Sequence, residues 1–161
     1  MTLYDNFCII HAVTPKDLKK CFEVQDEVFI KEQKHSVDIV RDGLEDICQH
    51  WVAVCDKKND NGTVEFEYPI GTVRLMPKEN GVAKLGRLAV LSSARGLYAG
   101  QKLVKAFIEY CKNNSYHTIV LHAQIDRRGF YERLGFVVEE GDSEVFIESH
   151  TPHVRMWMRG L

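Results

Sequence analysis

Residues Arg87 to Cys111 read RLAVLSSARGLYAGQKLVKAFIEYC, and this stretch decides the fold. It opens with the apolar run Leu88 to Leu91, passes through a turn that holds Gly96 and Gly100, and ends in an apolar pattern with helical spacing. The apolar positions of that helix are Leu103, Val104, Phe107, Ile108 and Cys111. A strand that enters a glycine-containing turn before a helix presents unpaired backbone N–H groups and the positive end of the helix dipole. The stretch is therefore typical of a loop that binds phosphate.

The turn differs from two familiar phosphate loops. A Walker loop ends in Gly-Lys-Ser/Thr and a dinucleotide loop needs Gly-x-Gly-x-x-Gly, and neither pattern occurs here. The turn instead resembles motif A of the GNAT superfamily of N-acetyltransferases, Gln/Arg-x-x-Gly-x-Gly/Ala after a strand. Arg95 and Gly100 match its first and last positions, whereas Tyr98 stands where the middle Gly is usual. An ordinary strand, turn and helix without a ligand remains an alternative.

A second motif adds to the resemblance. Gln124 to Phe136 reads QIDRRGFYERLGF, similar to the Phe-Tyr-Glu-x-x-Gly-Phe signature that follows motif A by one strand in GNAT enzymes. Further segments resemble the ElaA-like branch of the superfamily: Glu27 to Gln33, Asp42 to Glu45, His50 to Ala53, Leu121 to Gln124 and Phe146 to Met156. The resemblance covers Glu27 to Met156, with three departures from the usual residues: Tyr98 for Gly, Gln124 for Asn and Arg127 for Ala.

The resemblance implies an α/β fold of the GNAT acyl-CoA N-acyltransferase type. In that fold a mixed, mostly antiparallel, twisted sheet of about six or seven strands carries helices on both faces. The residues agree with this expectation. Two hairpin-like turns before the central turn predict an antiparallel meander, and a strand reached through the central helix is expected to be parallel to the one before it.

Local signals predict the remaining elements. Phe7 to Val13 reads as the first strand, and Thr14 and Pro15 read as the N-cap and first residue of a helix. We expect the strand Glu65 to Met76 to be interrupted near Pro69, and Asp126 to cap a short helix that ends at Gly135. The last two strands of the sheet are expected at Phe136 to Glu140 and Val154 to Met158.

Composition limits the class of protein. The chain has 161 residues, 45% hydrophobic and 27% charged, which predicts one soluble domain over residues 1–161. A formal net charge of −2 favours neither nucleic acid nor membrane as a partner, and no apolar run is long enough to span a bilayer. An odd count of five cysteines and the lack of a signal-peptide pattern predict a cytoplasmic protein, with the nucleus as an alternative. Cys48, His50 and Cys55 do not complete a zinc site, so no metal is expected.

The resemblance implies that acetyl-CoA is the co-substrate. Its pyrophosphate would be held by the turn and helix start, and its pantetheine arm would lie where the strands ending at Val90 and Gln124 splay apart. A backbone N–H from Leu88 to Val90 would stabilise the developing charge on the thioester oxygen. The residues expected to bind the cofactor are Leu88, Ala89, Val90, Arg95, Gly96, Leu97, Tyr98, Ala99, Gly100, Gln101 and Gln124.

The resemblance also implies the catalytic groups. Tyr131 matches the residue that protonates the departing thiolate, and Glu148 is our candidate for the base or amine anchor. His153 is the rival base, because a histidine titrates near neutral pH without a shift. His50 and Arg74 are candidate contacts to the acceptor.

The predicted function is direct transfer of an acetyl group from acetyl-CoA to an amine, either a small molecule or a side chain, by a monomer or homodimer. Two alternatives stay open. The first is a CoA-binding module without turnover, and the second is a structural interaction domain whose phosphate turn is fortuitous. The sequence does not discriminate among a polyamine, an amino sugar and a lysine side chain as the acceptor.

Overall fold

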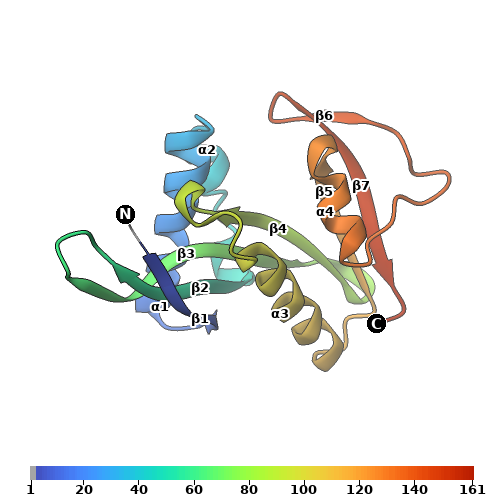
Figure 1. The fold of residues 1–161 in the computed structure, drawn as a ribbon. Helices are drawn as coiled ribbons and strands as arrows, with labels where there is room; N and C mark the ends of the chain where they lie inside the picture. The colour runs from blue at the N-terminus through green and yellow to red at the C-terminus, as the bar shows by residue number, and fades with distance from the viewer. Residues whose placement is uncertain (1–2) are drawn as a thin grey trace. The chain divides into compact units, whose positions relative to one another are not determined.

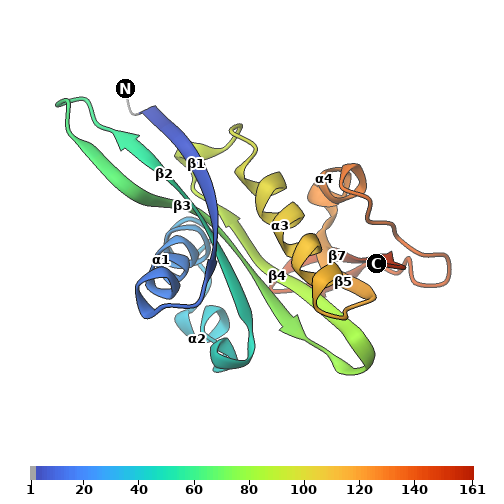
Figure 2. The same ribbon diagram turned by 90° about the horizontal axis from the view of Figure 1, so that it is seen from below.

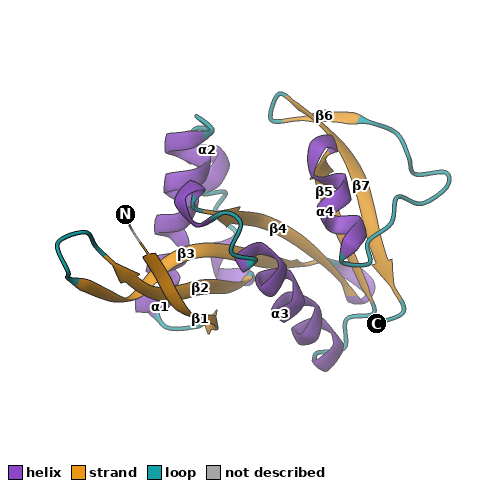
Figure 3. Cartoon of the chain, viewed as in Figure 1, coloured by secondary structure: helices purple, strands orange, loops and turns teal. Residues whose placement is uncertain are grey.

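The computed structural model describes residues 3–161 (Figure 1). Over this range seven strands form one sheet in the order β1-β2-β3-β4-β5-β7-β6. The strands are β1 (Leu3–Ala12), β2 (Gln49–Lys58), β3 (Val64–Pro77), β4 (Val82–Val90), β5 (Thr118–Gln124), β6 (Phe146–Glu148) and β7 (Thr151–Arg159). The helices are α1 (Pro15–Gln25), α2 (Val37–Val40), α3 (Ala99–Asn113) and α4 (Arg128–Arg133) (Figure 3). The predicted mixed α/β architecture is confirmed.

The parallel crossover predicted from the central stretch is also confirmed. β4 leads through α3 to β5, and the two strands pair in parallel from Val82↔Thr118 to Leu85↔Leu121. The pairings of β1 with β2, β5 with β7 and β6 with β7 are antiparallel. The sheet is therefore mixed and mostly antiparallel.

The chain forms two compact units. The first reaches to Arg74 and also contains Arg87–Ala106, and the second contains Leu75–Gly86 and Phe107–Leu161. β3, β4 and α3 each contribute residues to both. The single-domain organisation of residues 1–161 stays a prediction, and the two units are described separately below.

In the first unit α1 begins as its sequence predicts. The Thr14 hydroxyl accepts a hydrogen bond from the Asp17 backbone N–H at 3.2 Å, and Pro15 occupies the first turn, where no N–H partner is needed. Cys21 of this helix packs with Ala12, Val52 and Val54 of β1 and β2 in a buried apolar cluster. Burial of these side chains holds α1 against the strands.

The start of α3 covers the other face of these strands (Figure 2). Gly71 of β3 makes this approach possible, because a Cβ at that position would lie 2.9 Å from Leu103 Cδ1 and 3.3 Å from the carbonyl oxygen of Ala89. Real Cβ atoms do not show the shorter contact, so a larger residue at Gly71 would force the buried Leu103 side chain to shift.

After α1 the chain continues as a π-helix, Asp26–Glu32, and then through the four-residue α2 and a 3-10 turn, Glu45–Ile47. The π-helix is a rare conformation that is often found near functional sites. Val28 of the π-helix and Val24 of α1 pack against Ala89 of β4 in a second buried cluster.

Three local predictions were wrong. β3 runs through Pro69 without a break, and its irregular residue is Glu67, whose φ is 53°. Asp126 lies inside a 3-10 turn, Ile125–Arg127, and α4 starts after it with no side-chain cap, because the tighter turn takes the place of the cap. Phe136 to Glu140, predicted to be a strand, contributes only a bridge between Val137 and Trp157. The edge strand beside β7 is instead β6.

In the second unit α4 ends at Arg133, and Gly135 follows with the expected left-handed backbone, a φ of 101° that glycine adopts freely and that is costly for other residues. The turn leads into Phe136, which is fully buried and lies 6.0 Å, ring to ring, from Tyr131. Phe130 packs edge-on against Tyr131 at 5.0 Å. The aromatic residues therefore hold Tyr131 in a rigid position.

Candidate active site

The turn predicted to bind phosphate lies in the first unit. Gly96 and Tyr98 both adopt left-handed backbone, with φ of 91° and 63°, and α3 begins at Ala99. The first bond of the helix runs from the Lys102 N–H to the Tyr98 oxygen at 3.1 Å. The N–H groups of Ala99 to Gln101 precede that bond and have no carbonyl one turn back within the helix. The turn thus presents a row of donors at the positive end of a 15-residue helix.

Tyr98 adopts left-handed backbone although it stands where motif A usually has a glycine. Its side chain is 68% exposed and its backbone takes the conformation that Gly favours. A tyrosine with positive φ costs about 1–2 kcal/mol relative to ordinary backbone. The geometry of the loop is kept, and the substitution adds strain to the turn.

Arg95 is held by the protein itself in this structure. Its Nη2 donates to both carboxylate oxygens of Glu32, at 3.0 and 2.8 Å, and its Nε donates to the Val90 oxygen at 3.2 Å. Both side chains are partly exposed, 40% for Arg95 and 38% for Glu32. An anion at the turn would therefore compete with Glu32 for the guanidinium.

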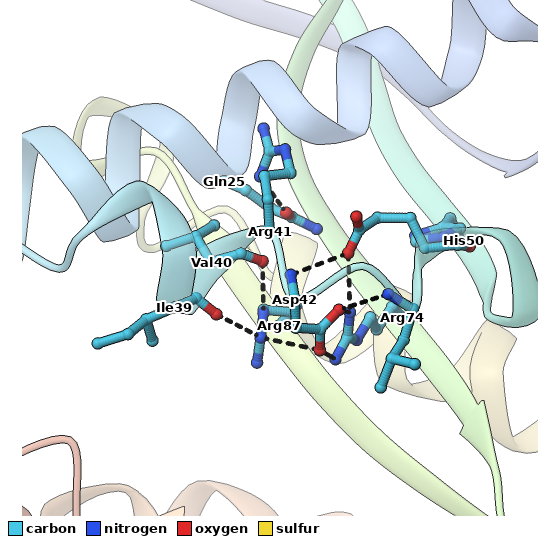
Figure 4. Close-up of polar contacts among 10 residues, drawn as sticks. Gln25, Ile39, Val40, Arg41, Asp42, His50, Arg74 and Arg87 are labelled. Carbon is cyan, nitrogen blue, oxygen red and sulfur yellow. Dashed lines mark hydrogen bonds and ion pairs between the residues drawn. The ribbon is translucent and has the colours of Figure 1, made fainter.

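Arg87 in β4 has a left-handed backbone, with φ of 52°. Such a residue inside a strand marks a local distortion of the ladder. Its guanidinium donates to the backbone oxygens of Val40 (3.3 Å) and Ile39 (2.9 Å), so it links the end of α2 to the distorted strand (Figure 4). Leu88, Ala89 and Val90 follow the distortion directly.

Asp42 is the centre of a charge network in the first unit. Arg74 grips it through two parallel hydrogen bonds, Nη1–Oδ1 at 3.1 Å and Nη2–Oδ2 at 2.5 Å, and Arg87 lies 3.4 Å from Oδ2 (Figure 4). Glu45 lies 3.7 Å from Arg74, whose side chain is only 6% exposed. The hydrogen bonds from Arg74 hold the pKa of Asp42 well below its usual range. The predicted acceptor contact Arg74 is thus fully engaged by carboxylates.

His50 lies beside this network and is 2% exposed. Its Nε2 donates to the Glu45 backbone oxygen at 3.0 Å, so Nδ1 is the unprotonated nitrogen of the neutral ring. Nδ1 is buried and has no hydrogen-bond partner among the described residues. Burial lowers the pKa of His50, which keeps the ring neutral.

Tyr131 and Gln124 lie in the second unit. Tyr131 is 9% exposed, and burial raises its pKa to about 12, so the phenol carries its proton at neutral pH. Gln124 is the last residue of β5 and is paired in register with His153 of β7. It is half-buried at the end of its strand.

Glu148 and His153 are neighbours in the second unit, but each already has a partner. Glu148 Oε2 lies 2.7 Å from His122 Nδ1, and His153 Nδ1 donates to the Thr151 backbone oxygen at 2.8 Å. Phe146 lies between the two histidines, edge-on to His122 at 5.0 Å and stacked on His153 at 6.0 Å. Burial is the largest single influence and raises the pKa of Glu148, but the hydrogen bond from His122 and the charges of His122, Lys84 and His153 together outweigh it, so the pKa is lowered. The structure therefore does not raise the pKa of Glu148 toward neutrality, as a general base would require.

Comparison with known proteins agrees with this geometry. Residues 53–159 match the family described as Acetyltransferase (GNAT) domain. The uncharacterized N-acetyltransferase YjcF of Bacillus subtilis (strain 168) is 30% identical over 146 residues, which are 90% of this chain and 94% of YjcF. The chain belongs to the GNAT acetyltransferase family.

Two solved structures share the GNAT fold over almost the whole chain. A protein from Lactobacillus plantarum assigned as an N-acetyltransferase superposes with a TM-score of 0.81 at 25% identity, covering 98% of this chain and all of that one. Escherichia coli ElaA superposes with a TM-score of 0.73 at 20% identity, covering 96% of this chain and 99% of ElaA. The resemblance to this superfamily is confirmed.

Sequence reasoning missed three residues of these GNAT clusters. Asp42 was quoted only within a motif, and Arg87 was placed with Arg74 on adjacent strands that could face either solvent or the acceptor. Their ion pair joins residues 45 positions apart, so the sequence did not reveal it. His122 lay inside a quoted motif, and strand alternation places it on the same face as Gln124, two residues later. Its pairing with Glu148 joins residues 26 positions apart, which no spacing rule predicts.

Two further observations concern cofactors and membranes. Across residues 3–161 no set of three or more His, Cys, Asp and Glu side chains is arranged to hold a metal ion. In the same range, no helix combines the length and apolar character needed to pass through a bilayer.

Proposed function

We propose that this GNAT protein transfers an acetyl group from acetyl-CoA directly to an amine, without a covalent acetyl-enzyme. The observation that carries the proposal is the start of α3. Gly96, Tyr98 and Ala99 form a turn whose free N–H donors suit the pyrophosphate of CoA. The family match over residues 53–159 supports acetyl-CoA as the donor.

Two segments of the chain supply the other cofactor contacts in this proposal. Leu88 to Val90 follow the distorted residue Arg87, and a backbone N–H there stabilises the charge that develops on the thioester oxygen. Gln124 bonds the amide groups of the pantetheine arm through its side chain. Both roles remain proposals for these residues.

Tyr131 delivers a proton to the CoA thiolate. A phenol with a pKa of about 12 stays protonated until it is needed. An ordinary thiol has a pKa of about 8.5, so the thiolate is a weaker base than the phenolate that the transfer leaves behind. The transfer is therefore favourable only if the phenolate recovers a proton as the amine loses one. We therefore expect Tyr131 to increase the rate by about 100-fold, the lower end of the range for a general acid.

The function is tested with acetyl-CoA and a panel of amines: spermidine, lysine, an amino sugar and an alkylamine. The expected result is release of CoA, separated by chromatography, in the presence of at least one amine. A rise in melting temperature with CoA but no release with any amine would favour the alternative, a CoA-binding module without turnover. No rise with CoA would contradict the proposed site itself. Gly100→Val serves as a control, because its side chain obstructs approach to the turn and should abolish the rise.

A further inference from the structure

Three strands of the second unit place a set of polar and aromatic side chains on one face. In an antiparallel pair, directly opposite residues share a face, and so do residues two apart on one strand. β5 pairs with β7 through His122↔Arg155 and Gln124↔His153, and β6 pairs with β7 through Phe146↔His153 and Glu148↔Thr151. One face therefore carries His122, Gln124, Phe146, Glu148, His153 and Arg155. The other face is apolar there, with Leu121, Ala123, Val154 and Met156 all buried.

The hydrogen bond between His122 and Glu148 fixes the tautomer of the histidine. The pKa of Glu148 is lowered, so its carboxylate is ionised at neutral pH and can only accept a hydrogen bond. At 2.7 Å the proton of the pair must sit on His122 Nδ1. In the neutral ring this leaves the lone pair on Nε2. A carboxylate that orients a histidine in this way is the arrangement by which enzymes prepare an imidazole to accept a proton.

We propose that His122 accepts the proton of the acceptor amine through Nε2, and that Glu148 is a positioning residue that orients the ring. This inference rests on the proposed acetyltransferase function and deepens it by assigning its base. The His122 side chain is 21% exposed, so an acceptor can reach the ring, and Phe146 packs edge-on against it and restricts its rotation.

The charged groups around His122 keep it available as a base. Burial lowers its pKa, the hydrogen bond to Glu148 opposes that shift, and the positive charges of Lys84 and Arg155 add to the lowering. Besides Glu148 and Arg155, the face carries one more titratable group, His153, which is separated from His122 by Phe146. Because the folded pKa lies below the ordinary 6.5, the ring is neutral at pH 7 and becomes protonated only at lower pH.

Glu148 and His153 fit the role of base less well. Glu148 is a weak base, because its pKa is lowered and its Oε2 is already bonded to His122. His153 is 7% exposed and stacked on Phe146, so its ring is less accessible than that of His122. His153 instead supports the ring of Phe146, which in turn supports His122.

The proton and electron balance of the step is simple. The ammonium form of the acceptor gives one proton to His122 Nε2, which later releases it to solvent. The free amine attacks the acetyl carbonyl, the C–N bond forms, and the C–S bond breaks with its electron pair on sulfur. The thiolate takes the proton of Tyr131, and the second proton of the amine restores the phenol through solvent. The products are the acetamide, CoA and one proton.

The test measures kcat against pH from 5 to 9 with the best amine of the panel, using an amine whose pKa is near 10.4 so that it stays protonated throughout. Wild type should show an acidic limb below pH 6.5, where His122 becomes protonated. We expect His122→Gln to lower kcat by about 100-fold at pH 7 and to remove this limb. His150→Asn is the matched control, because His150 is exposed and has a φ of 68° that Asn tolerates.

Glu148 is tested with two variants. Glu148→Ala removes the acceptor for Nδ1–H and should lower kcat by about tenfold. Glu148→Gln keeps an acceptor but removes the charge that raises the pKa of His122, so it should recover part of the rate and move the acidic limb to lower pH. A residue that is only structural would not move the limb.

An NMR titration of the histidine rings gives a readout that does not depend on turnover. We expect His122 to titrate below 6.5 as the Nδ1–H tautomer in wild type, and lower still in Glu148→Gln. An acidic limb that survives His122→Gln, or that only His153→Gln removes, overturns the role of His122 and leaves the proposed function intact. Failure of wild type to acetylate any amine overturns the function and this role with it. In every case, an unchanged rise in melting temperature with CoA shows that the variant is folded.

Discussion

The two polar clusters of the molecule are built from similar side chains but differ in how completely those side chains are satisfied. Around Asp42 in the first unit, two arginines neutralise the carboxylate, and the Arg74 side chain is 6% exposed. Around Glu148 in the second unit, a single hydrogen bond joins two side chains that are 21% and 46% exposed. Nε2 of the histidine in the second cluster keeps a lone pair directed away from that bond.

The difference indicates two kinds of role. A buried arginine that holds a carboxylate through two hydrogen bonds resists change, because removal of either partner leaves an unpaired charge. A half-exposed His–Glu pair costs little to disturb but can exchange protons with a substrate. The first cluster should therefore control stability and the second should control rate. Each of the following experiments tests one side of this distinction.

The largest effect is expected from Arg74→Met, which breaks the buried network. The substitution leaves Asp42 and Glu45, whose side chains are 24% and 22% exposed, without their main counter-ion, and we expect a loss of about 3 kcal/mol. Urea unfolding at pH 7 measures the loss. Arg128→Met is the matched control, because the Arg128–Glu132 pair is about half exposed and should contribute below about 1 kcal/mol. Equal losses for the two variants would contradict the structural role of the first cluster.

A rate effect without a stability effect is expected from Tyr131→Phe in the second unit. Phenylalanine keeps the edge-on contacts with Phe130 and Phe136 but cannot protonate the thiolate. We expect kcat to fall by about 100-fold, with the rise in melting temperature on CoA binding unchanged. Steady-state kinetics and thermal unfolding in parallel check the two parts. An unchanged kcat would show that Tyr131 is a packing residue.

A small increase in stability is expected from Tyr98→Gly, because the substitution removes backbone strain in the first unit. Tyr98 has a φ of 63° and an exposed side chain, so glycine removes strain while little packing is lost. We expect the free energy of unfolding to rise by about 1 kcal/mol. Equilibrium unfolding with urea measures it. Leu97→Gly is the control, because that position has no left-handed backbone, and it should lower stability.

The smallest effect is expected from Glu32→Gln at the cofactor turn. The Arg95–Glu32 pair is partly exposed, so it contributes about 0.2–1 kcal/mol, and CoA must replace Glu32 as the partner of Arg95. Removing the charge should tighten CoA binding by at most about fivefold in calorimetric titration. Weaker binding would mean that Glu32 positions Arg95 for the cofactor.

The central stretch and the edge strand β6 show which parts of the fold can be predicted from the sequence. The strand, turn and helix from Leu88 to Cys111, the capped start of α1 and the parallel pairing of β4 with β5 were all predicted, because each follows from local periodicity or a local cap. The edge strand β6 was missed, because a three-residue strand carries no period of its own and forms only by pairing with β7. Pro69 was misread as a break, whereas β3 continues through it and the irregular backbone is at Glu67, which no local signal marks.

The candidate site divides in the same way. Motif residues such as Arg95, Gly100 and Tyr131 could be named from the sequence, but their partners could not. Glu32 lies 63 positions from Arg95, and Arg74 lies 32 positions from Asp42. Contacts of this length depend on the packing of whole elements. They also decide whether a side chain is available, which is why the expected roles of Glu148 and Arg74 needed the structure.

The most direct measurement of the central claim follows both products of the reaction by mass spectrometry. The protein is first incubated with acetyl-CoA alone, and its intact mass is recorded before an amine is added. Direct transfer predicts an unmodified protein mass, followed by CoA and acetylated amine in equal amounts. An acetylated protein whose acetyl group then passes to the amine would contradict direct transfer. Absence of any acetylated amine across the panel would contradict the acetyltransferase function.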